Sequence, residues 1–235
     1  CSLSHSSSIV LLVMVVLQLV VVVIYDLNRQ RRRPIAAAEA MPYAVASAPA
    51  AVDDALAATR WVADHLADLG GNASLGVAGD SAGGNLSAVV AQVFRDEGRP
   101  LAGQLLFYPG TDLVGDHPSL TENAEGYFLD VPTMEFFRDQ YVGHLDGVGL
   151  DDPRLSPLHG DVAGVAPAVV ATAQFDPLRD QGHAYATRLA DAGVRVEHTT
   201  FPGLIHGFVD MGRYSPAAQE AIQQTCAAFR ELLHS

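Results

Sequence analysis

Residues 75–85 read Leu-Gly-Val-Ala-Gly-Asp-Ser-Ala-Gly-Gly-Asn. The apolar residues 75–78 predict a short strand, and residues 86–97, followed by Gly98, predict a helix. Between them, residues 79–84 match the Gly-x-Ser-x-Gly pattern of a nucleophile elbow, which requires a strand before it and a helix after it. A glycine-rich turn with a solvated, anion-binding serine is the alternative.

The glycines of this turn have a steric reason. A nucleophilic Ser81 sits in a strained turn, and we expect side chains at positions 79 and 83 to collide with the neighbouring strand and helix. The start of the helix also directs the Ala82 N–H and the positive end of a dipole toward a developing oxyanion.

A serine nucleophile needs a base, and the base needs an acid to hold its tautomer. Asp176 follows an apolar strand and precedes Pro177, which places it at the carboxyl edge of a parallel sheet. His206 lies 30 residues further on, between Ile205 and Gly207, in a loop after the next predicted strand. The chain order Ser81, Asp176, His206 is the order of α/β-hydrolases, so we expect these three to form a catalytic triad.

Other acids and imidazoles have weaker contexts. Asp180 begins the next helix and is better explained as a cap or first-turn carboxylate. Asp80 precedes Ser81, and a nucleophile elbow directs the side chains next to the serine away from the site. His198 lies in a strand and His183 on a helix, which favours surface or packing roles. The histidines without any supporting motif are His65, His117, His144 and His159.

Strands and helices alternate along the chain from about residue 50. Helices are expected over residues 53–69, 182–192 and 216–233, and strands over residues 104–108, 168–173 and 194–201. This alternation predicts an α/β fold with a mostly parallel central sheet and helices on both faces.

Residues 113–158 interrupt the alternation. No core strand is evident there, and the one helical pattern, over residues 133–142, lies between loops that contain Pro and Gly. An insertion of this length beside a sheet indicates a small helical cap over a binding site, with a plain surface excursion as the alternative. We expect one α/β-hydrolase domain over residues 49–235.

Residues 1–48 form an atypical N-terminal segment. Residues 9–24 are apolar except for Gln18, and four arginines follow, the last being Arg33. The β-branched residues 20–25 favour a buried parallel strand, and a membrane anchor is the alternative, although 16 residues fall short of the roughly 20 that span a bilayer. A linker over residues 34–48 completes the segment.

Charge and cysteine content limit the classes of partner and ligand that the chain could bind. The net charge of −13, with no basic stripe after residue 33, argues against nucleic acid. The two cysteines, Cys1 and Cys226, provide neither a disulfide framework nor metal-ligand spacing. The cysteines therefore predict no metal site, and we expect a cytoplasmic location, with membrane contact possible only through residues 9–24.

These residues resemble a known family, the bacterial esterases related to hormone-sensitive lipase. The resemblance runs from about Pro49 to the C-terminus and includes the elbow, Tyr108-Pro109, residues 152–158, the Asp176 segment and residues 205–208. It implies an α/β-hydrolase fold with a cap and no cofactor. It also implies hydrolysis of short- to medium-chain acyl esters through an acyl-enzyme, and many relatives pair as homodimers.

One family feature is missing. Members carry a His-Gly-Gly-Gly stretch upstream of the elbow, whose N–H groups complete the oxyanion hole, and residues 1–50 contain nothing similar. Loss of one oxyanion donor lowers turnover about 10²- to 10³-fold. A catalytically impaired hydrolase-fold protein that binds a ligand is therefore the alternative to an esterase.

Overall fold

The computed structural model describes residues 50–70, 74–143 and 147–234 in full, and residues 9–16, 19–26 and 31–37 as backbone strands. Its centre is a seven-stranded sheet with the order β3-β2-β1-β4-β5-β6-β7. The strands are β1 (Ile9–Val16), β2 (Leu19–Asp26), β3 (Arg31–Ala37), β4 (Leu75–Asp80), β5 (Gly103–Phe107), β6 (Ala168–Phe175) and β7 (Val196–Ile205). The α/β fold with a mostly parallel sheet is thus confirmed.

The parallel part of the sheet carries the predicted core strands. β1, β4, β5, β6 and β7 run parallel to their neighbours in that order, and β4 is buried along nearly its whole length. Such continuous burial is typical of a parallel strand covered on both faces. It explains why residues 75–80 show no polar alternation before Asp80.

The N-terminal apolar run forms two strands. β1 and β2 pair antiparallel, from Ile9 opposite Asp26 to Val16 opposite Leu19, and β3 pairs antiparallel with β2. β2 covers residues 20–25, where a parallel strand was expected, and it runs antiparallel to both of its neighbours. The predicted linker overlaps β3 up to Ala37, and residues 38–49 lie outside the described residues.

Residues 9–16 and 19–24, for which a membrane anchor was the alternative prediction, belong to β1 and β2. Across the residues that the structure describes, none of the helices is long and apolar enough to cross a membrane.

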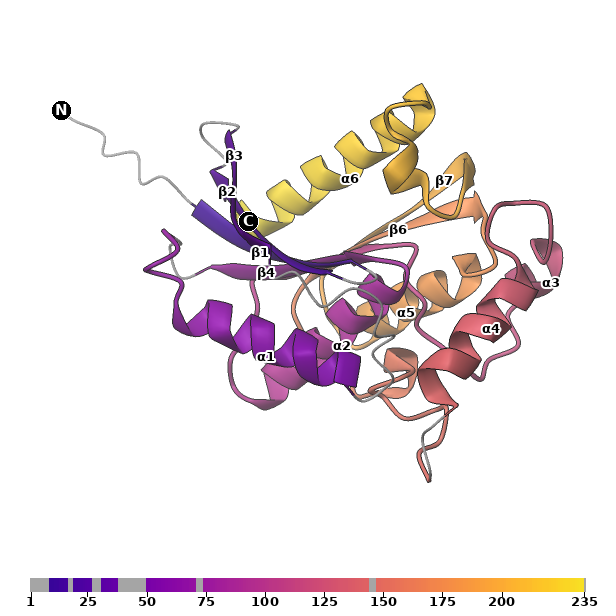
Figure 1. Ribbon diagram of the computed structural model, residues 1–235, viewed down its shortest axis with the longest axis horizontal. Helices are drawn as coiled ribbons and strands as arrows, with labels where there is room; N and C mark the ends of the chain where they lie inside the picture. Colours follow the sequence, from indigo (N-terminus) through magenta and orange to yellow (C-terminus); the bar gives the residue numbers. More distant parts are fainter. Residues whose placement is uncertain are drawn as a thin grey trace.

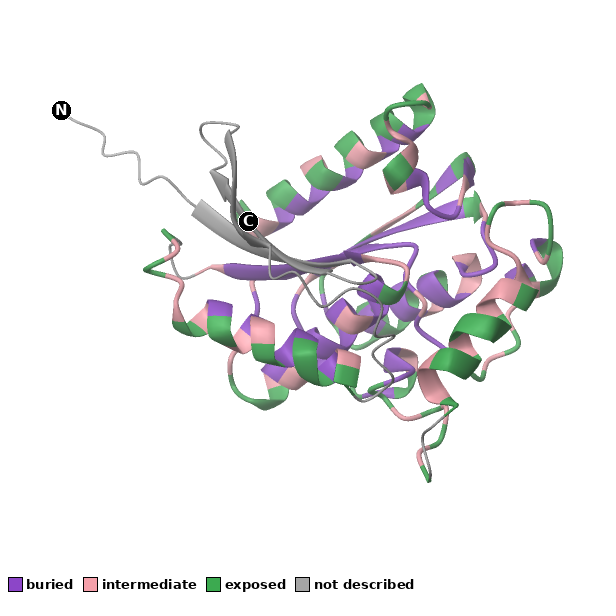
Figure 2. Ribbon diagram, viewed as in Figure 1, coloured by how far each residue is buried: buried purple, intermediate pink, exposed green. Residues whose placement is uncertain are grey.

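Helices cover both faces of the sheet (Figure 1). In this view α6 (Pro216–His234) lies above the sheet, and α1 (Ala50–Asp64), α2 (Ala82–Asp96) and α5 (Arg179–Asp191) lie below it. Side chains of β6 alternate accordingly: Val169 and Ala171 pack in the cluster under α6, and Ala168 and Val170 pack with Tyr185 of α5. Figure 2 shows the buried residues concentrated in these strands and on the helix surfaces that face them.

Several element boundaries differ from those predicted. α1 ends at Asp64, before the expected stop at Gly70, and α5 begins at Arg179, three residues before Gly182. β7 continues through Pro202 to Ile205. A proline is tolerated there because β7 is the last strand of the sheet and its outer edge needs no ladder bond.

Residues 113–158 contain α3 (Pro118–Glu122), α4 (Val131–Val142) and the start of the 3-10 turn η1 (Pro157–His159), with no strand among their described residues. The end of the segment is fastened to α2. Asn85 Nδ2 donates to Leu155 O at 2.7 Å, and Gln92 Nε2 donates to Pro157 O at 2.8 Å. The motif at residues 152–158 therefore returns the chain to the helix that follows the elbow.

A buried carboxylate joins the two ends of this segment. Asp112, 7% exposed, accepts hydrogen bonds from His117 Nε2 at 2.8 Å and from His159 Nε2 at 2.9 Å. Burial raises the pKa of Asp112, but the hydrogen bonds from His159, Val114 N–H, His117 and Gly115 N–H outweigh burial and lower that pKa to about 2. The ionised form is thus the one that the fold stabilises.

Asp112→Asn is expected to lower the free energy of unfolding by about 2 to 4 kcal/mol at neutral pH, because charge-assisted hydrogen bonds are lost in a buried site. A carboxyl whose folded pKa is depressed stabilises the fold above its unfolded pKa, near 3.8, and loses that contribution as pH falls toward 2. Urea unfolding between pH 7 and pH 2 measures both effects. The exposed neighbour Asp116, changed to Asn, is the control, and equal losses in the two variants would contradict the assignment.

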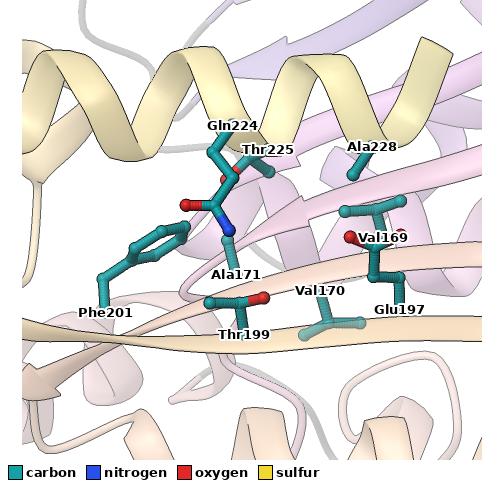
Figure 3. A pocket seen from close by; sticks show the side chains of 9 residues that line it. All are labelled: Val169, Val170, Ala171, Glu197, Thr199, Phe201, Gln224, Thr225 and Ala228. Atoms are coloured by element: carbon teal, nitrogen blue, oxygen red, sulfur yellow. The ribbon is translucent and has the colours of Figure 1, made fainter. Parts of the chain in front are cut away.

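A small, partly open cavity lies beside the sheet, and its lining does not include Ser81, Asp176 or His206. It has a volume of about 10 Å³ between α6 and strands β6 and β7 (Figure 3). That volume holds about one water. The lining residues are Val169, Val170, Ala171, Glu197, Thr199, Phe201, Gln224, Thr225 and Ala228. A space of this size is too small for an ester, so this cavity is not a candidate substrate site.

Candidate active site

Ser81 occupies a strained turn between β4 and α2. Its φ of 54° is unusual for a residue with a side chain. The backbone around it is held in place: Ser81 N donates to Phe107 O at 2.9 Å, and Ser81 O accepts from Asn85 N at 3.1 Å and from Gly110 N at 3.3 Å. These bonds to neighbouring elements maintain a conformation that the residue alone disfavours.

The glycines beside Ser81 are sterically required at two positions. A Cβ at Gly79 would lie 2.1 Å from Gly83 O, and a Cβ at Gly84 would lie 2.8 Å from Pro109 Cβ. The collision expected at position 79 is therefore with the first turn of α2. The close approach of α2 to Pro109 lets the helix begin directly after the serine.

His206 lies between Ser81 and Asp176. His206 Nε2 is 2.9 Å from Ser81 Oγ, and His206 Nδ1 is 2.8 Å from Asp176 Oδ2. Asp176 is fully buried, His206 is 6% exposed and Ser81 is partly exposed. These residues form one line of hydrogen bonds from the buried Asp176 to the partly exposed Ser81. His206 is 125 positions from Ser81 and 30 positions from Asp176 in the chain.

A backbone N–H and a side-chain amide hold Asp176 in position. Asp176 Oδ1 accepts from Leu178 N–H at 2.8 Å, which leaves Oδ2 for His206. Asn123, 3% exposed and located after α3, donates to Asp176 O at 3.2 Å. Sequence reasoning missed Asn123, because a contact across 53 residues leaves no local signal.

Tyr108 packs against His206. Its ring centroid lies 4.6 Å from that of His206, and its φ is 36°. Burial, followed by the charges of Asp80 and Asp210, raises the pKa of Tyr108, so the phenol stays neutral. The sequence pointed to Tyr108 only as part of a family motif, and the structure gives it contact with the imidazole.

The other acids and histidines that the sequence offered for the triad have different contacts. Asp80 Oδ2 is 3.4 Å from Tyr108 OH, and burial, then Asp210, raises the pKa of Asp80. Asp180, in the first turn of α5, accepts from Ser119 N at 2.8 Å. His183 and His198 contact each other at 3.4 Å. Of the remaining histidines, His65 contacts Trp61 O, His117 and His159 contact Asp112, and His144 lies outside the described residues.

The N-terminus of α2 faces the same point. Ala82 is the first residue of α2 and is exposed, and the first N–H groups of a helix have no acceptor within the helix. Ala82 N–H is thus a candidate oxyanion donor beside Ser81. In the described ranges, no group of three or more His, Cys, Asp or Glu residues has a metal-binding arrangement.

Comparisons with known proteins agree with this geometry. The sequence pattern of a family described as alpha/beta hydrolase fold matches residues 42–210. Carboxylesterase NlhH of Mycobacterium tuberculosis is 45% identical over 194 residues, covering 80% of this chain and 60% of the relative. An ethyl acetate hydrolase of Pseudomonas putida is 41% identical over 192 residues, covering 79% and 59%.

Solved structures give the same result. The crystal structure of EstE1, a thermostable carboxylesterase from a metagenomic library, matches with a TM-score of 0.74 at 39% identity, over 80% of this chain and 65% of that one. The chain spans about 60% of the length of the relatives named above.

Proposed function

Because the chain belongs to the α/β-hydrolase family, we propose that it is a serine carboxylester hydrolase that acts on short- to medium-chain acyl esters. The observation that carries the proposal is the line from Ser81 Oγ through His206 to the buried Asp176, with links of 2.9 and 2.8 Å. Relatives named as a carboxylesterase and an ethyl acetate hydrolase support the ester class.

Acylation begins at Ser81. His206 Nε2 accepts the Ser81 proton while Oγ attacks the ester carbonyl carbon, and Asp176 stabilises the imidazolium through Nδ1–H. The carbonyl oxygen becomes an oxyanion to which Ala82 N–H donates. The C–O bond to the alcohol then breaks, and His206 returns its proton to the departing alkoxide.

Deacylation repeats these steps with water. His206 removes a proton from a water molecule, whose oxygen attacks the acyl-serine carbonyl. Collapse of the second tetrahedral intermediate releases the carboxylic acid, and the proton on His206 returns to Ser81 Oγ. No cofactor takes part in either half of the reaction.

We further propose that residues 113–158 cap this site. Phe128 carries the argument: it is 75% exposed, its φ is 75°, and Leu129 N donates to Tyr127 O at 3.0 Å across it, which makes a strained γ-turn. A Cβ added at Gly207 would lie 3.2 Å from the Phe128 ring, so the ring rests against the residue after His206. Since His206 protonates the departing alcohol, Phe128 lines the alcohol side of the site.

Phe128→Ala is expected to lower kcat/KM for phenyl acetate about 3- to 10-fold and to change kcat/KM for ethyl acetate less than twofold. The reason is the loss of an aromatic contact worth about 0.5–1.5 kcal/mol. Phe136→Ala, which removes an exposed phenylalanine of α4, is the control. Equal losses for both esters, or the same selectivity change at Phe136, would count against the alcohol-side assignment.

The function itself is tested with the purified chain. We expect turnover of p-nitrophenyl acetate and butyrate, weaker turnover of longer acyl chains, and attachment of one fluorophosphonate per chain at Ser81, located by mass spectrometry. A protein that melts cooperatively but neither turns over these esters nor reacts with the probe would overturn the proposal and favour a ligand-binding role.

A further inference from the structure

A pair of histidines lies outside the candidate active site, on two adjacent elements. His183 is on the exposed side of α5, and His198 is on the edge strand β7, half-buried. Their rings are tilted by 57° with centroids 5.0 Å apart, and their Nδ1 atoms are 3.4 Å apart. The proposed hydrolysis assigns no role to either residue.

The distance between the two nitrogens suits a metal ion better than a hydrogen bond. N–H hydrogen bonds in proteins usually span about 2.7–3.2 Å, so 3.4 Å is long for a direct imidazole–imidazole bond. A tetrahedral Zn²⁺ with nitrogen ligands at about 2.0–2.1 Å holds two of them about 3.4 Å apart. The pair therefore has the spacing of two ligands around one ion.

The surroundings of His198 allow the tautomer that a metal requires. His198 Nε2 is 3.2 Å from Thr172 Oγ1, which is 2.8 Å from Thr200 Oγ1. When Nε2–H donates to Thr172, the lone pair lies on Nδ1, facing His183. Metal-binding histidines usually have such a polar partner on the other ring nitrogen.

Charge also favours an ion at this place. The net charge of −13 attracts cations to the protein as a whole. In the part of the chain that the structure describes, no third His, Cys, Asp or Glu completes a metal-binding group, so water would fill the remaining positions.

We propose that His183 and His198 form a two-histidine site for a divalent transition-metal ion, with Zn²⁺ as the expected occupant. The bound ion would link α5, which begins shortly after Asp176, to β7, which ends just before His206. Because a ligand that binds only the folded state stabilises it, Zn²⁺ should raise the melting temperature. This site is independent of the esterase proposal.

Zn²⁺ titration by calorimetry at pH 7.5 tests the site. We expect one equivalent to bind the wild-type chain and to raise its melting temperature. His183→Gln or His198→Gln should weaken binding at least tenfold, and Thr172→Val about tenfold through the lost orientation of His198. His65→Gln is the control: it removes a histidine that contacts the ring and the carbonyl oxygen of Trp61, and it should bind Zn²⁺ as the wild type does.

A spectroscopic measurement separates this site from other histidines. Co²⁺ in place of Zn²⁺ should give visible absorption bands of a four-coordinate ion in the wild type and in His65→Gln, and none in the double variant His183→Gln/His198→Gln. If one equivalent of Zn²⁺ still binds the double variant with unchanged affinity, or if the wild type binds none, the proposal is wrong. Ester turnover is not needed for either result.

Discussion

Ser81→Ala is expected to lower kcat for p-nitrophenyl acetate by about 10⁵- to 10⁶-fold and to abolish fluorophosphonate labelling. The methyl group cannot attack the carbonyl, and members of a triad act as a unit, so the remaining His206–Asp176 pair compensates little. Residual turnover should come only from substrate binding and from donors such as Ala82 N–H. Initial rates and intact-protein mass spectrometry measure both effects.

Ser87→Ala provides a matched control for this substitution. Ser87 lies on the same helix α2, and its buried hydroxyl has no hydrogen-bond partner among the described residues. Removing an unpaired buried hydroxyl is neutral or stabilising, so activity and melting temperature should match the wild type or exceed it. If Ser87→Ala lost activity as Ser81→Ala does, a general disturbance of α2 would explain both, and Ser81 would not be assigned as the nucleophile.

The elbow was predictable because its signal is local. Residues 79–84 join the end of a buried strand to the start of a helix, and the positive φ of Ser81 and the close approach of Gly79 to Gly83 both arise within these six residues. His206 was predictable for a related reason. It is a single imidazole beside Gly207, and it follows directly after a predicted strand. The line of hydrogen bonds that joins them depends on the order of β4, β5, β6 and β7 in the sheet, whereas the alternation of elements predicted only that the sheet is mostly parallel.

What sequence reasoning missed was non-local. An unbroken apolar run carries no period, so residues 9–24 could not show where β1 ends and β2 begins, or that the two strands oppose each other. Asn123 reaches the backbone of Asp176 through the fold of the inserted segment. The pairing of Asp112 with His117 and His159 likewise closes a segment whose ends are 47 residues apart, and neither histidine had a motif.

Two groups of residues hold the site in place, and substitutions in them should have different effects on folding and activity. Gly79, Gly84 and Asn85 shape the elbow through contacts that any substitution disturbs, so their variants should lose fold and activity together. Leu178 N–H and Asn123 instead orient Asp176 without touching the reacting atoms. A substitution that preserves those contacts while changing the charge of Asp176 therefore separates chemistry from folding.

Asp176→Asn is that substitution, and it is expected to lower kcat about 10⁴-fold with little change in melting temperature. Leu178 N–H requires an acceptor at 2.8 Å, so the amide oxygen stays at the Oδ1 position and the NH₂ group takes the place of Oδ2. The NH₂ then donates to His206 Nδ1, which puts the imidazole proton on Nε2, where it cannot accept the Ser81 proton. The wrong tautomer, rather than a lost side chain, causes the defect.

Steady-state kinetics beside a thermal melt measure this effect, and Asp180→Asn is the control. Asp180 is an acid four residues further on that contacts Ser119 and Arg179, so its amide variant should keep wild-type kcat even where it loses some stability. A large loss of kcat at Asp180 with normal activity in Asp176→Asn would reassign the acid of the triad. Loss in Asp176→Asn alone, with Ser81 no longer labelled by fluorophosphonate at the wild-type rate, would establish that Asp176 acts on Ser81 through the tautomer of His206.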